Sequence, residues 1–269
     1  MNSGRKLSSV NFCAIDLETT GVNPAFNKII EIGAAKFRLD GAVETFHTLV
    51  NPGVSIPETV IRIHGITDSM VASAPVIEDI IDSFHDFIED SVLVIQNPRF
   101  DLSFIDRAFR SNEIIFAPLQ ALDTVRLAKN YFPDLPNHKL STLAEHLGIV
   151  CRKHRALDDA LVCMQVFLEV LRGRGMGENS SLDDIMTIHG ESVKPGISTF
   201  LKAKSEPLKG ISIGEEVTIC YRDSDGIITR RSILPKEFIS YGRKNYILAH
   251  CYLRGSERCF MASRIIGID

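Results

Sequence analysis

Two acidic residues stand one position apart where an apolar run ends. The stretch FCAIDLETTG begins at Phe12 like a buried strand and then contains Asp16 and Glu18. Because successive side chains of a strand point to opposite faces, these two carboxylates share one face. They repel each other there, and a divalent cation such as Mg²⁺ or Mn²⁺ would offset the repulsion. Taken alone, the pattern also fits a solvated pair at the start of a turn.

Further candidate groups lie downstream, each near the end of an expected element. Asp101 follows the apolar strand 91–96 and falls in the first turn of a helix, where an acid also interacts well with the helix dipole. His154 precedes a long helix, and Asp159 lies at the border of the apolar stripe of that helix. Each group alone has a structural alternative, but together they indicate acids that converge on one cleft.

Hydrophobic periodicity predicts the elements that position these groups. The first part reads as three strands, and helices then alternate with a further strand. We therefore expect a mixed sheet covered by helices. The expected strands are 10–16, 28–38, 44–50 and 91–97, and the expected helices are 74–88, 100–112, 123–132, 139–149 and 155–171.

A second module follows a change in composition. The stretch RGRGMGENSS at 172–181 is rich in glycine and polar residues and ends the first domain. We interpret 173–209 as a linker that contains a short helix at 182–188. Residues 210–269 then read as a small all-β module. Its expected strands are 215–223, 227–235, 245–253 and 258–265.

Composition indicates a globular protein, with 45% hydrophobic and 24% charged residues in a chain of 269. There is no apolar run of ~18 residues and no apolar stretch typical of a secretory signal, so we expect a cytoplasmic protein without a membrane partner. The six cysteines form no CxxC pair and are expected to be free thiols. Residues 1–191 hold 17 Lys and Arg against 26 Asp and Glu, a net −9, whereas residues 192–269 hold 13 against 8, a net +5.

Three motifs in order resemble those of the DEDDh 3′–5′ exonucleases, the DnaQ-like branch of the ribonuclease H-like fold. These are DLETTG, NPRFD and HRALDDA, and IHGIT, LDTVRLAK and KLSTLAEHLGI resemble secondary signatures of the family. The resemblance implies an α/β domain over residues 9–172, with a ribonuclease H-like mixed sheet flanked by helices. Two departures are Gln96, where many members have His, and Pro98.

The resemblance also implies roles for individual residues. Four acids would bind two Mg²⁺ or Mn²⁺ ions, with Asp16 bridging them, and His154 would be the catalytic general base. The acids are Asp16, Glu18, Asp101 and Asp159. Asp158 is interpreted as solvated. The implied substrate contacts are Leu17, Thr19, Thr20, His64, Asn97 and Phe100, although His64 also fits a turn-stabilising role and Phe100 a core position.

The last 60 residues resemble the WYL domain, a small Sm-like β-barrel. The resemblance rests on VTICYRDSDGIITRRSILP and NYILAHCYLRGSERCFMASRI, and Asn245 stands where that family often has Trp. It implies a ligand-facing set of arginines: Arg231, Arg254, Arg258 and Arg264. Tyr246 and Tyr252 would add stacking surfaces. The alternative is that these arginines pair with Glu215, Glu216 or Glu257 on a solvated surface.

Together these features predict a metal-dependent 3′–5′ exonuclease that hydrolyses phosphodiester bonds of single-stranded DNA or RNA from a free 3′ end. The C-terminal module would bind or sense nucleic acid or a nucleotide. Two alternatives stay open: an oligoribonuclease-like enzyme for very short oligonucleotides, and a non-enzymatic nucleic-acid-binding regulator. The sequence leaves open DNA against RNA, the pathway, and whether the chain forms a homodimer.

Overall fold

The computed structural model describes residues 4–117, 119–150, 154–200 and 208–269, and its chain divides into two compact units. Unit 1 consists of Met1–Val22 and Lys28–Pro195. Unit 2 consists of Gly196–Asp269 together with the short segment Asn23–Asn27. The division therefore falls inside the stretch 173–209 that was expected to be a linker.

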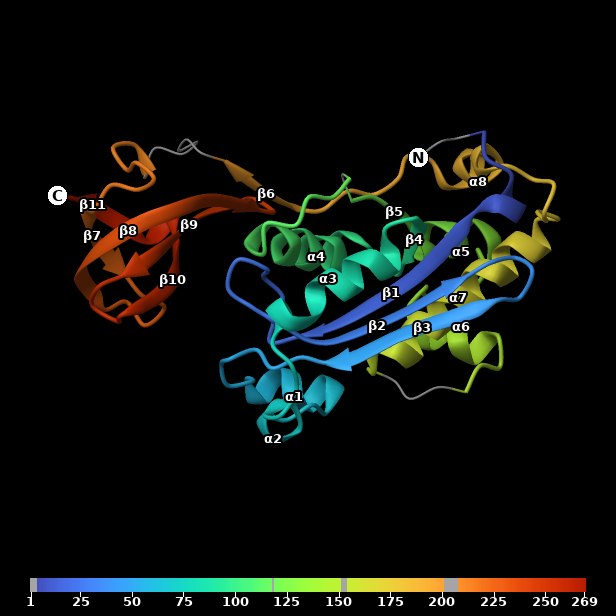
Figure 1. Ribbon diagram of the computed structural model, residues 1–269, viewed down its shortest axis with the longest axis horizontal. Coiled ribbons are helices and arrows are strands. Elements are labelled where there is room, and N and C mark those ends of the chain that lie inside the picture. The colour runs from blue at the N-terminus through green and yellow to red at the C-terminus, as the bar shows by residue number, and fades with distance from the viewer. Residues whose placement is uncertain (1–3, 118, 151–153, 201–207) are drawn as a thin grey trace. The chain divides into compact units, whose positions relative to one another are not determined.

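Unit 1 is built on a five-stranded mixed sheet in the order β3-β2-β1-β4-β5 (Figure 1). The strands are β1 (Asn11–Thr19), β2 (Ile29–Phe37), β3 (Val43–Leu49), β4 (Ser91–Ile95) and β5 (Ala121–Asp123). The first three pair antiparallel, whereas β1–β4 and β4–β5 are parallel. The expected mixed sheet is confirmed. Periodicity missed β5, because three residues are too short to carry a pattern.

Helices cover both faces of this sheet. They are α1 (Glu58–His64), α2 (Asp68–Val71), α3 (Ile77–Ile88), α4 (Arg99–Ser111), α5 (Thr124–Tyr131), α6 (Leu140–His146), α7 (Ala156–Gly173) and α8 (Leu182–His189). The last of these is the short helix expected near 182–188, and its Leu182 and Ile185 are buried in the core of unit 1. On one face of the sheet α4 contacts β1 and α3 contacts β2, and on the opposite face α7 contacts β1.

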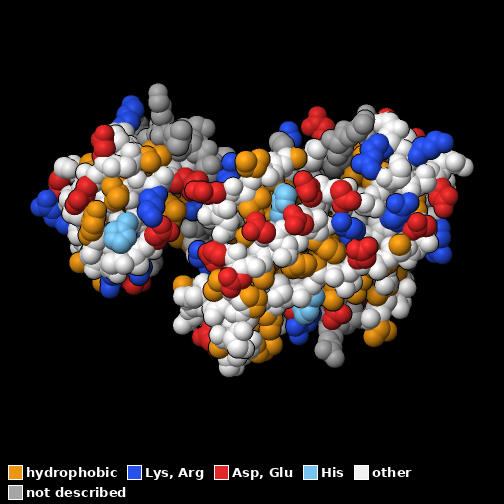
Figure 2. All heavy atoms as spheres, in the orientation of Figure 1, with side chains coloured by type: hydrophobic (Ala, Val, Ile, Leu, Met, Phe, Trp, Pro, Cys, Tyr) orange, Lys and Arg blue, Asp and Glu red, His pale blue; other side chains and the backbone are white. Residues whose placement is uncertain are grey.

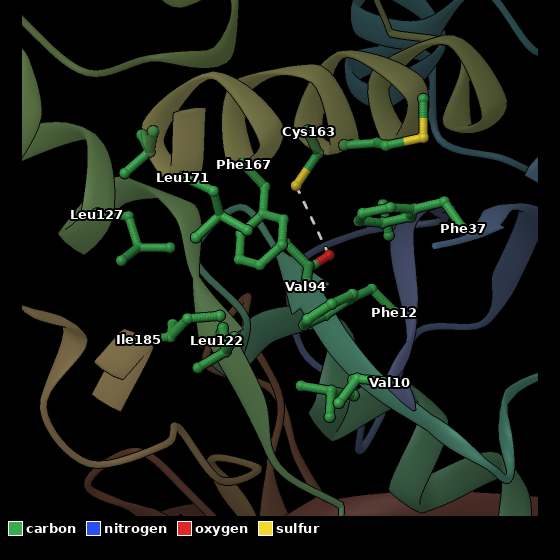
Figure 3. Packing of buried hydrophobic residues seen from close by; sticks show 14 of the residues in the cluster. Val10, Phe12, Phe37, Val94, Leu122, Leu127, Cys163, Phe167, Leu171 and Ile185 are labelled. Atoms are coloured by element: carbon green, nitrogen blue, oxygen red, sulfur yellow. Dashed lines mark hydrogen bonds between the residues drawn. The ribbon is translucent and has the colours of Figure 1, made fainter. Parts of the chain in front are cut away.

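The α7 face of the sheet has an aromatic core (Figure 3). Phe12, Phe37 and Phe167 are almost fully buried, and their ring centroids lie 5.0–5.9 Å apart. Since side chains alternate along β1, Phe12 and Ala14 face α7, and so do Asp16 and Glu18 beyond them. The same alternation that builds this core therefore carries the two acids to the strand end on the α7 side.

Gly33 of β2 lets the start of α7 come into direct backbone contact with the sheet. A Cβ atom at Gly33 would lie 2.1 Å from the carbonyl carbon of Ala156 and 2.1 Å from the backbone nitrogen of Leu157. No side chain fits in that space. The absence of a side chain at Gly33 therefore sets how closely the first turn of α7 approaches β2.

Unit 2 contains an antiparallel sheet in the order β10-β9-β8-β7-β11, with β6 paired to β8. The strands are β6 (Ile197–Phe200), β7 (Val217–Arg222), β8 (Ile228–Tyr241), β9 (Lys244–Cys251), β10 (Ser256–Met261) and β11 (Ile265–Ile268). Closure of this sheet into the expected Sm-like barrel stays a prediction.

Two strand boundaries in unit 2 differ from the expectation. The strand expected to end at Pro235 continues as β8, because the register shifts between Pro235 and Glu237 and accommodates the proline as a bulge. The run expected as one strand over 258–265 is divided by a 3₁₀ turn, Ala262–Arg264. Each difference is a local backbone irregularity that an alternating pattern does not reveal.

The segment Asn23–Asn27 is attached to unit 2 through Tyr246. The Asn23 Nδ2 atom donates a hydrogen bond of 2.8 Å to the Tyr246 hydroxyl, and the Phe26 ring lies edge-on to the Tyr246 ring. Ala25 joins the same hydrophobic cluster. Tyr246 is 1% exposed, so it is an internal packing residue of this unit.

Five cysteines carry free thiols: Cys13, Cys163, Cys220, Cys251 and Cys259. Cys151 lies outside the described residues. Within the described ranges, no helix is long and apolar enough to cross a membrane.

Substitution of Gly33 by alanine should destabilise unit 1, because the added methyl group would overlap the backbone at the start of α7. We expect a loss of about 1–3 kcal/mol in the free energy of unfolding, the range for overpacked cores. Urea unfolding followed by circular dichroism measures it. Gly177→Ala is the matched control, since nothing lies within 4 Å of that position. A stability equal to wild type in the Gly33 variant would contradict the close approach.

Candidate active site

Asp16 and Glu18 lie at the end of β1, next to the base of the loop that leads to β2. Regular pairing with β2 is interrupted between Glu18 and Thr19 by a register shift, which ends the strand. The Thr20 amide then donates to the Lys28 carbonyl at 2.9 Å, and the Lys28 amide donates to the Thr20 hydroxyl at 2.9 Å. These bonds fix the backbone that follows the two acids.

Asp101 enters the site from the first turn of α4. Its side chain is 3% exposed, and its carboxylate accepts hydrogen bonds from its own amide and from the amide of Leu17 on β1. The chain turns from β4 into α4 at Asn97, which has a positive φ of 58°. The Asn97 amide donates to the Asp123 carboxylate at 3.2 Å. The turn therefore directs the start of α4 toward the end of β1.

His154 and Asp159 enter from the start of α7. The His154 amide donates to the Asp159 Oδ2 atom at 3.1 Å, and His154 has a positive φ of 59°. Its side chain is exposed. Ligand atoms of Glu18, His154 and Asp159 all lie within 4.8 Å of one another. A non-glycine residue in the left-handed region is uncommon and is often found at functional sites.

The acids raise one another's pKa values. Burial raises the pKa of Asp16 well above its ordinary range, and the nearby charges of Asp101, Glu18 and Asp159 raise it further. Burial, followed by the charge of Asp159, raises the pKa of Glu18 to about 8. Without a counter-charge, the cluster favours protonated carboxyl groups at neutral pH.

The pKa values of the other two acids are also raised by burial, and hydrogen bonds partly offset the increase. Burial raises the pKa of Asp101 to about 7, against the opposing effect of the two amides that donate to it. Burial also raises the pKa of Asp159, against the hydrogen bond from the His154 amide. Carboxylate oxygens with one imidazole are a donor set that suits hard divalent cations. The residues of this site therefore fit a divalent metal ion.

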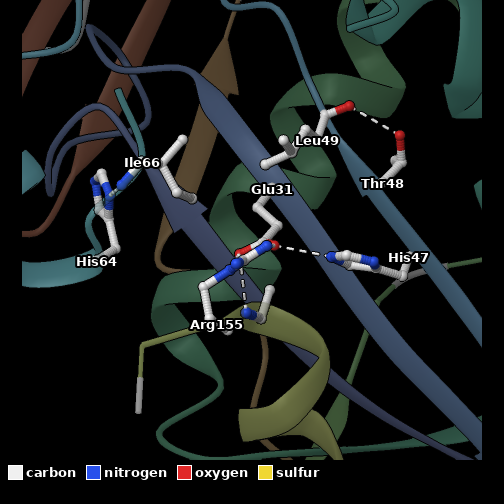
Figure 4. A network of polar contacts seen from close by, with 8 residues as sticks. Glu31, His47, Thr48, Leu49, His64, Ile66 and Arg155 are labelled. Atoms are coloured by element: carbon white, nitrogen blue, oxygen red, sulfur yellow. Dashed lines mark hydrogen bonds and ion pairs between the residues drawn. The ribbon is translucent and has the colours of Figure 1, made fainter. Parts of the chain in front are cut away.

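Glu31 is a further acid at this site that the sequence motifs did not predict (Figure 4). It lies on β2 directly across from Glu18 and is 0% exposed. Burial raises its pKa, but hydrogen bonds from Arg155, His47 and the Ala156 amide outweigh this and lower the pKa below its ordinary value. The available signal was an acid inside the otherwise apolar run IIEIGAA.

The expected substrate contacts have mixed environments. Leu17 is 4% exposed and Phe100 is partly buried, and both pack in the hydrophobic cluster under α3 and α4. Thr19 and Thr20 are buried at the end of β1. Gln96 donates to the His138 carbonyl and accepts from the Thr124 hydroxyl, so this departure from the family pattern has a structural role.

His64 has one ring nitrogen without a partner. Its Nδ1 atom accepts a hydrogen bond of 3.0 Å from the Ile66 amide, so the ring proton belongs on Nε2. The Nε2 atom is buried and has no hydrogen-bond partner among the described residues. Burial lowers the pKa of His64, so the ring is neutral at neutral pH. His64 therefore stabilises the turn through Nδ1, and its Nε2–H group is a buried donor without a partner among the described residues.

The expected arginines of unit 2 fall into two groups. Arg231 is 8% exposed, and its guanidinium lies 5.5 Å from the Tyr221 ring centroid and 5.9 Å from that of Phe260. Arg254 and Arg258 are exposed, and Arg264 is half-buried. Within the described parts of the chain, no acidic side chain forms an ion pair with Arg231.

The structure resembles solved exonucleases. E. coli Exonuclease I in complex with a dT13 oligonucleotide gives a TM-score of 0.56 at 16% identity, covering 84% of this chain and 52% of that chain. The nuclease domain of 3′hExo, a DEDDh family member bound to rAMP, gives a TM-score of 0.52 at 21% identity, covering 64% of this chain and 95% of that chain. At these identities the likeness defines the class of fold, which is the ribonuclease H-like exonuclease fold.

The sequence defines the family. Residues 13–167 match the exonuclease family and residues 208–269 match the WYL domain, so the chain belongs to the DEDDh 3′–5′ exonucleases and carries a WYL domain. The DNA polymerase III PolC-type protein of Caldanaerobacter subterraneus subsp. tengcongensis is 32% identical over 231 residues, which are 86% of this chain and 16% of that protein. The corresponding Thermotoga maritima protein is 35% identical over 205 residues, which are 74% of this chain and 15% of that protein. The chain thus spans 16% or less of the length of these relatives.

The raised carboxyl pKa values predict how stability depends on pH and cations. Between pH 6.5 and 8 the metal-free native state holds protons on Glu18 that the unfolded chain has already lost, so stability should fall as pH rises. Added Mn²⁺ should raise the melting temperature more at pH 8 than at pH 6.5. Differential scanning calorimetry of wild type and the double variant Asp16→Asn, Glu18→Gln measures both effects. A wild-type profile as flat as that of the double variant would contradict the charge clustering.

Proposed function

We propose that this chain hydrolyses phosphodiester bonds from the 3′ end of single-stranded nucleic acid in a reaction that depends on divalent metal ions. The observation that supports this most strongly is the convergence of Asp16 and Glu18, Asp101 and Asp159 from β1, α4 and α7. Their mutual repulsion gives the pocket a need for cations that solvated surface acids would not have.

The residues of the chain divide the work of this reaction. Asp16, Glu18, Asp101 and Asp159 would hold two Mg²⁺ or Mn²⁺ ions. Bound ions of this kind stabilise the attacking and the leaving oxygen in phosphoryl transfer. His154 would accept the proton of the attacking water, since its exposed imidazole lies beside Asp159 with the backbone held by that carboxylate.

His64 would bind the terminal nucleotide. Its Nε2–H is a buried donor with no partner in the described parts of the chain, and a buried unsatisfied donor costs about 1–3 kcal/mol. An oxygen of the substrate would satisfy it. This assignment uses only the neutral ring, in agreement with the lowered pKa of His64.

DNA is the substrate that the comparisons favour. The two relatives described above are named DNA polymerase III PolC-type, and the similar Exonuclease I structure contains a dT13 oligonucleotide. We therefore propose single-stranded DNA as the preferred polymer, and RNA and very short oligoribonucleotides are alternative outcomes of the same assay.

The C-terminal unit would bind nucleic acid through arginines and would form a small Sm-like barrel. Strand alternation on β10 puts Arg258 on the same sheet face as Phe260, whose ring lies near the Arg231 guanidinium. Guanidinium groups suit phosphate oxygens. On the face of unit 1 that Figure 2 shows, acidic and basic side chains are interspersed.

Substitution at the acids or at His154 tests the reaction. Asp16→Asn should abolish cleavage, and His154→Ala should lower kcat by about 10²–10⁴-fold, the usual contribution of a general base. The assay follows a 5′-labelled oligodeoxynucleotide with Mn²⁺, with a matched RNA and a length series in parallel. Asp158→Asn is the control, because this neighbouring acid should leave activity within about twofold of wild type. Full activity in Asp16→Asn, or no cleavage by wild type on any substrate, would refute the proposal.

Exposed arginines of unit 2 test nucleic-acid binding. The double variant Arg254→Ala, Arg258→Ala should weaken binding of a 20-mer oligo-dT. The slope of log K against log salt should fall by about 1.4, because each lost phosphate contact to single-stranded nucleic acid accounts for about 0.7. Fluorescence anisotropy at several salt concentrations measures this with wild type and variant. Lys209→Ala is a control of like charge outside the strands. An unchanged slope would contradict the assignment.

A further inference from the structure

Glu31 lies at the candidate metal-binding pocket, but protein donors occupy both of its carboxylate oxygens. Its Oε1 atom is 2.6 Å from Arg155 Nη2, 3.0 Å from Arg155 Nε and 2.8 Å from His47 Nε2. Its Oε2 atom accepts from the Ala156 amide at 3.0 Å and lies 3.3 Å from Arg155 Nε. Both oxygens are therefore engaged by protein donors, and one of these donors is a cationic guanidinium, whereas Asp101 and Asp159 accept from backbone amides.

The donors to Glu31 come mainly from the start of α7 (Figure 4). The residue at the N-cap of α7 is Arg155, whose side chain makes no capping bond to its own helix. The first helical amide, that of Ala156, is one of the orphan donors of a helix N-terminus. Glu31 on β2 accepts a hydrogen bond from this amide and so supplies the N-terminal cap that α7 lacks. Its negative charge also suits the helix dipole.

Arg155 and Ala156, the residues that Glu31 holds, lie next to the candidate catalytic groups in the chain. Arg155 follows His154, and the Arg155 carbonyl accepts the first helical hydrogen bond from the Asp159 amide at 2.9 Å. The His154 amide closes the loop by donating to the Asp159 carboxylate at 3.1 Å. A displacement of Arg155 would therefore move both His154 and Asp159.

The register of β2 connects this clamp to the other half of the pocket. Glu31 is the antiparallel partner of Glu18, and Gly33, two residues further on the same face, allows the backbone of α7 to lie against the strand. The contact between β2 and α7 thus holds together the ligand atoms of Glu18, His154 and Asp159, which lie within 4.8 Å of one another.

We propose that Glu31 is a positioning residue, which through Arg155 and the Ala156 amide holds His154 and Asp159 opposite Glu18, and that it is not a fifth metal ligand. This inference rests on the proposed function only for its effect on turnover. The effect on the backbone at the start of α7 stands independently of any activity.

Two variants separate a clamp from a metal ligand. Glu31→Gln keeps the shape but removes the charge, and Arg155→Gln removes the main donor while His47 and the Ala156 amide still donate to the carboxylate. As a clamp, both should lower kcat roughly 10²-fold, the cost of a small misplacement, with KM within about threefold. The double variant should be no slower than the worse single variant, because both act through one contact. Arg155→Lys, which keeps the charge without the two-pronged geometry, should fall between.

Hydrogen–deuterium exchange of metal-free protein supplies the readout without activity. Peptides that cover 154–160 should exchange at least about tenfold faster in Glu31→Gln, because the neutral amide no longer holds Arg155 and is a weaker acceptor for the Ala156 amide. His47→Ala is the matched control: it also removes a bond to Glu31, but His47 lies on β3, and within the described residues no hydrogen bond joins its side chain to α7. That variant should keep wild-type exchange at 154–160 and activity within about twofold.

The outcomes are distinct. Melting curves show which variants are folded at the assay temperature, so a kcat loss in folded protein separates positioning from simple destabilisation. If Arg155→Gln binds Mn²⁺ more tightly than wild type and keeps its turnover, Glu31 is a ligand and the inference is overturned. Unchanged exchange at 154–160 in Glu31→Gln also overturns it. If wild type cleaves nothing, the proposed function fails, and the exchange measurement still decides the role of Glu31.

Discussion

The candidate site depends on the contact between the start of α7 and strand β2. Gly33 removes the side chain that would hold the two backbones apart, and Glu31 binds Arg155 and the Ala156 amide at the point of approach. Because Asp16 and Glu18 belong to the neighbouring strand, this one contact fixes the distance between the acids of β1 and the acid of α7. The sheet provides the frame, and the helix start brings the last groups to it.

The same geometry places buried acidic side chains close enough to repel one another. Burial raises the pKa values of Asp16, Glu18, Asp101 and Asp159, and like charge adds to the effect at Asp16, Glu18 and Asp159. Glu31 beside them is instead paired with an arginine, and its pKa is lowered. The fold thus treats two kinds of buried acid differently. One is paired internally and contributes to structure. Among the residues that the structure describes, the others have no cationic partner of comparable strength, which is the arrangement expected where an external cation completes the site.

Much of unit 1 could be predicted, because its elements are long and their patterns are regular. The alternation on β1 predicted the shared face of Asp16 and Glu18, and the helical stripe on 155–171 predicted α7. Glu31 escaped, since only the register between β1 and β2 shows that it lies across from Glu18. The continuation of β8 through Pro235 escaped for a similar reason: a bulge depends on the partner strand, which a single sequence does not specify.

The tyrosines of unit 2 show how environment redistributes roles within a motif. Tyr246 was expected to offer a stacking surface, but it is buried, and its hydroxyl and ring are occupied by Asn23 and Phe26. Tyr252 remains 49% exposed. Arg231 is buried near two aromatic rings, and its Nε atom donates to the Thr229 hydroxyl at 2.8 Å. Since no acid among the described residues pairs with it, its Nη groups are the ones that would bind an anion. The case for nucleic-acid binding by this unit therefore depends on guanidinium groups, and base stacking can contribute to it only through side chains that remain exposed.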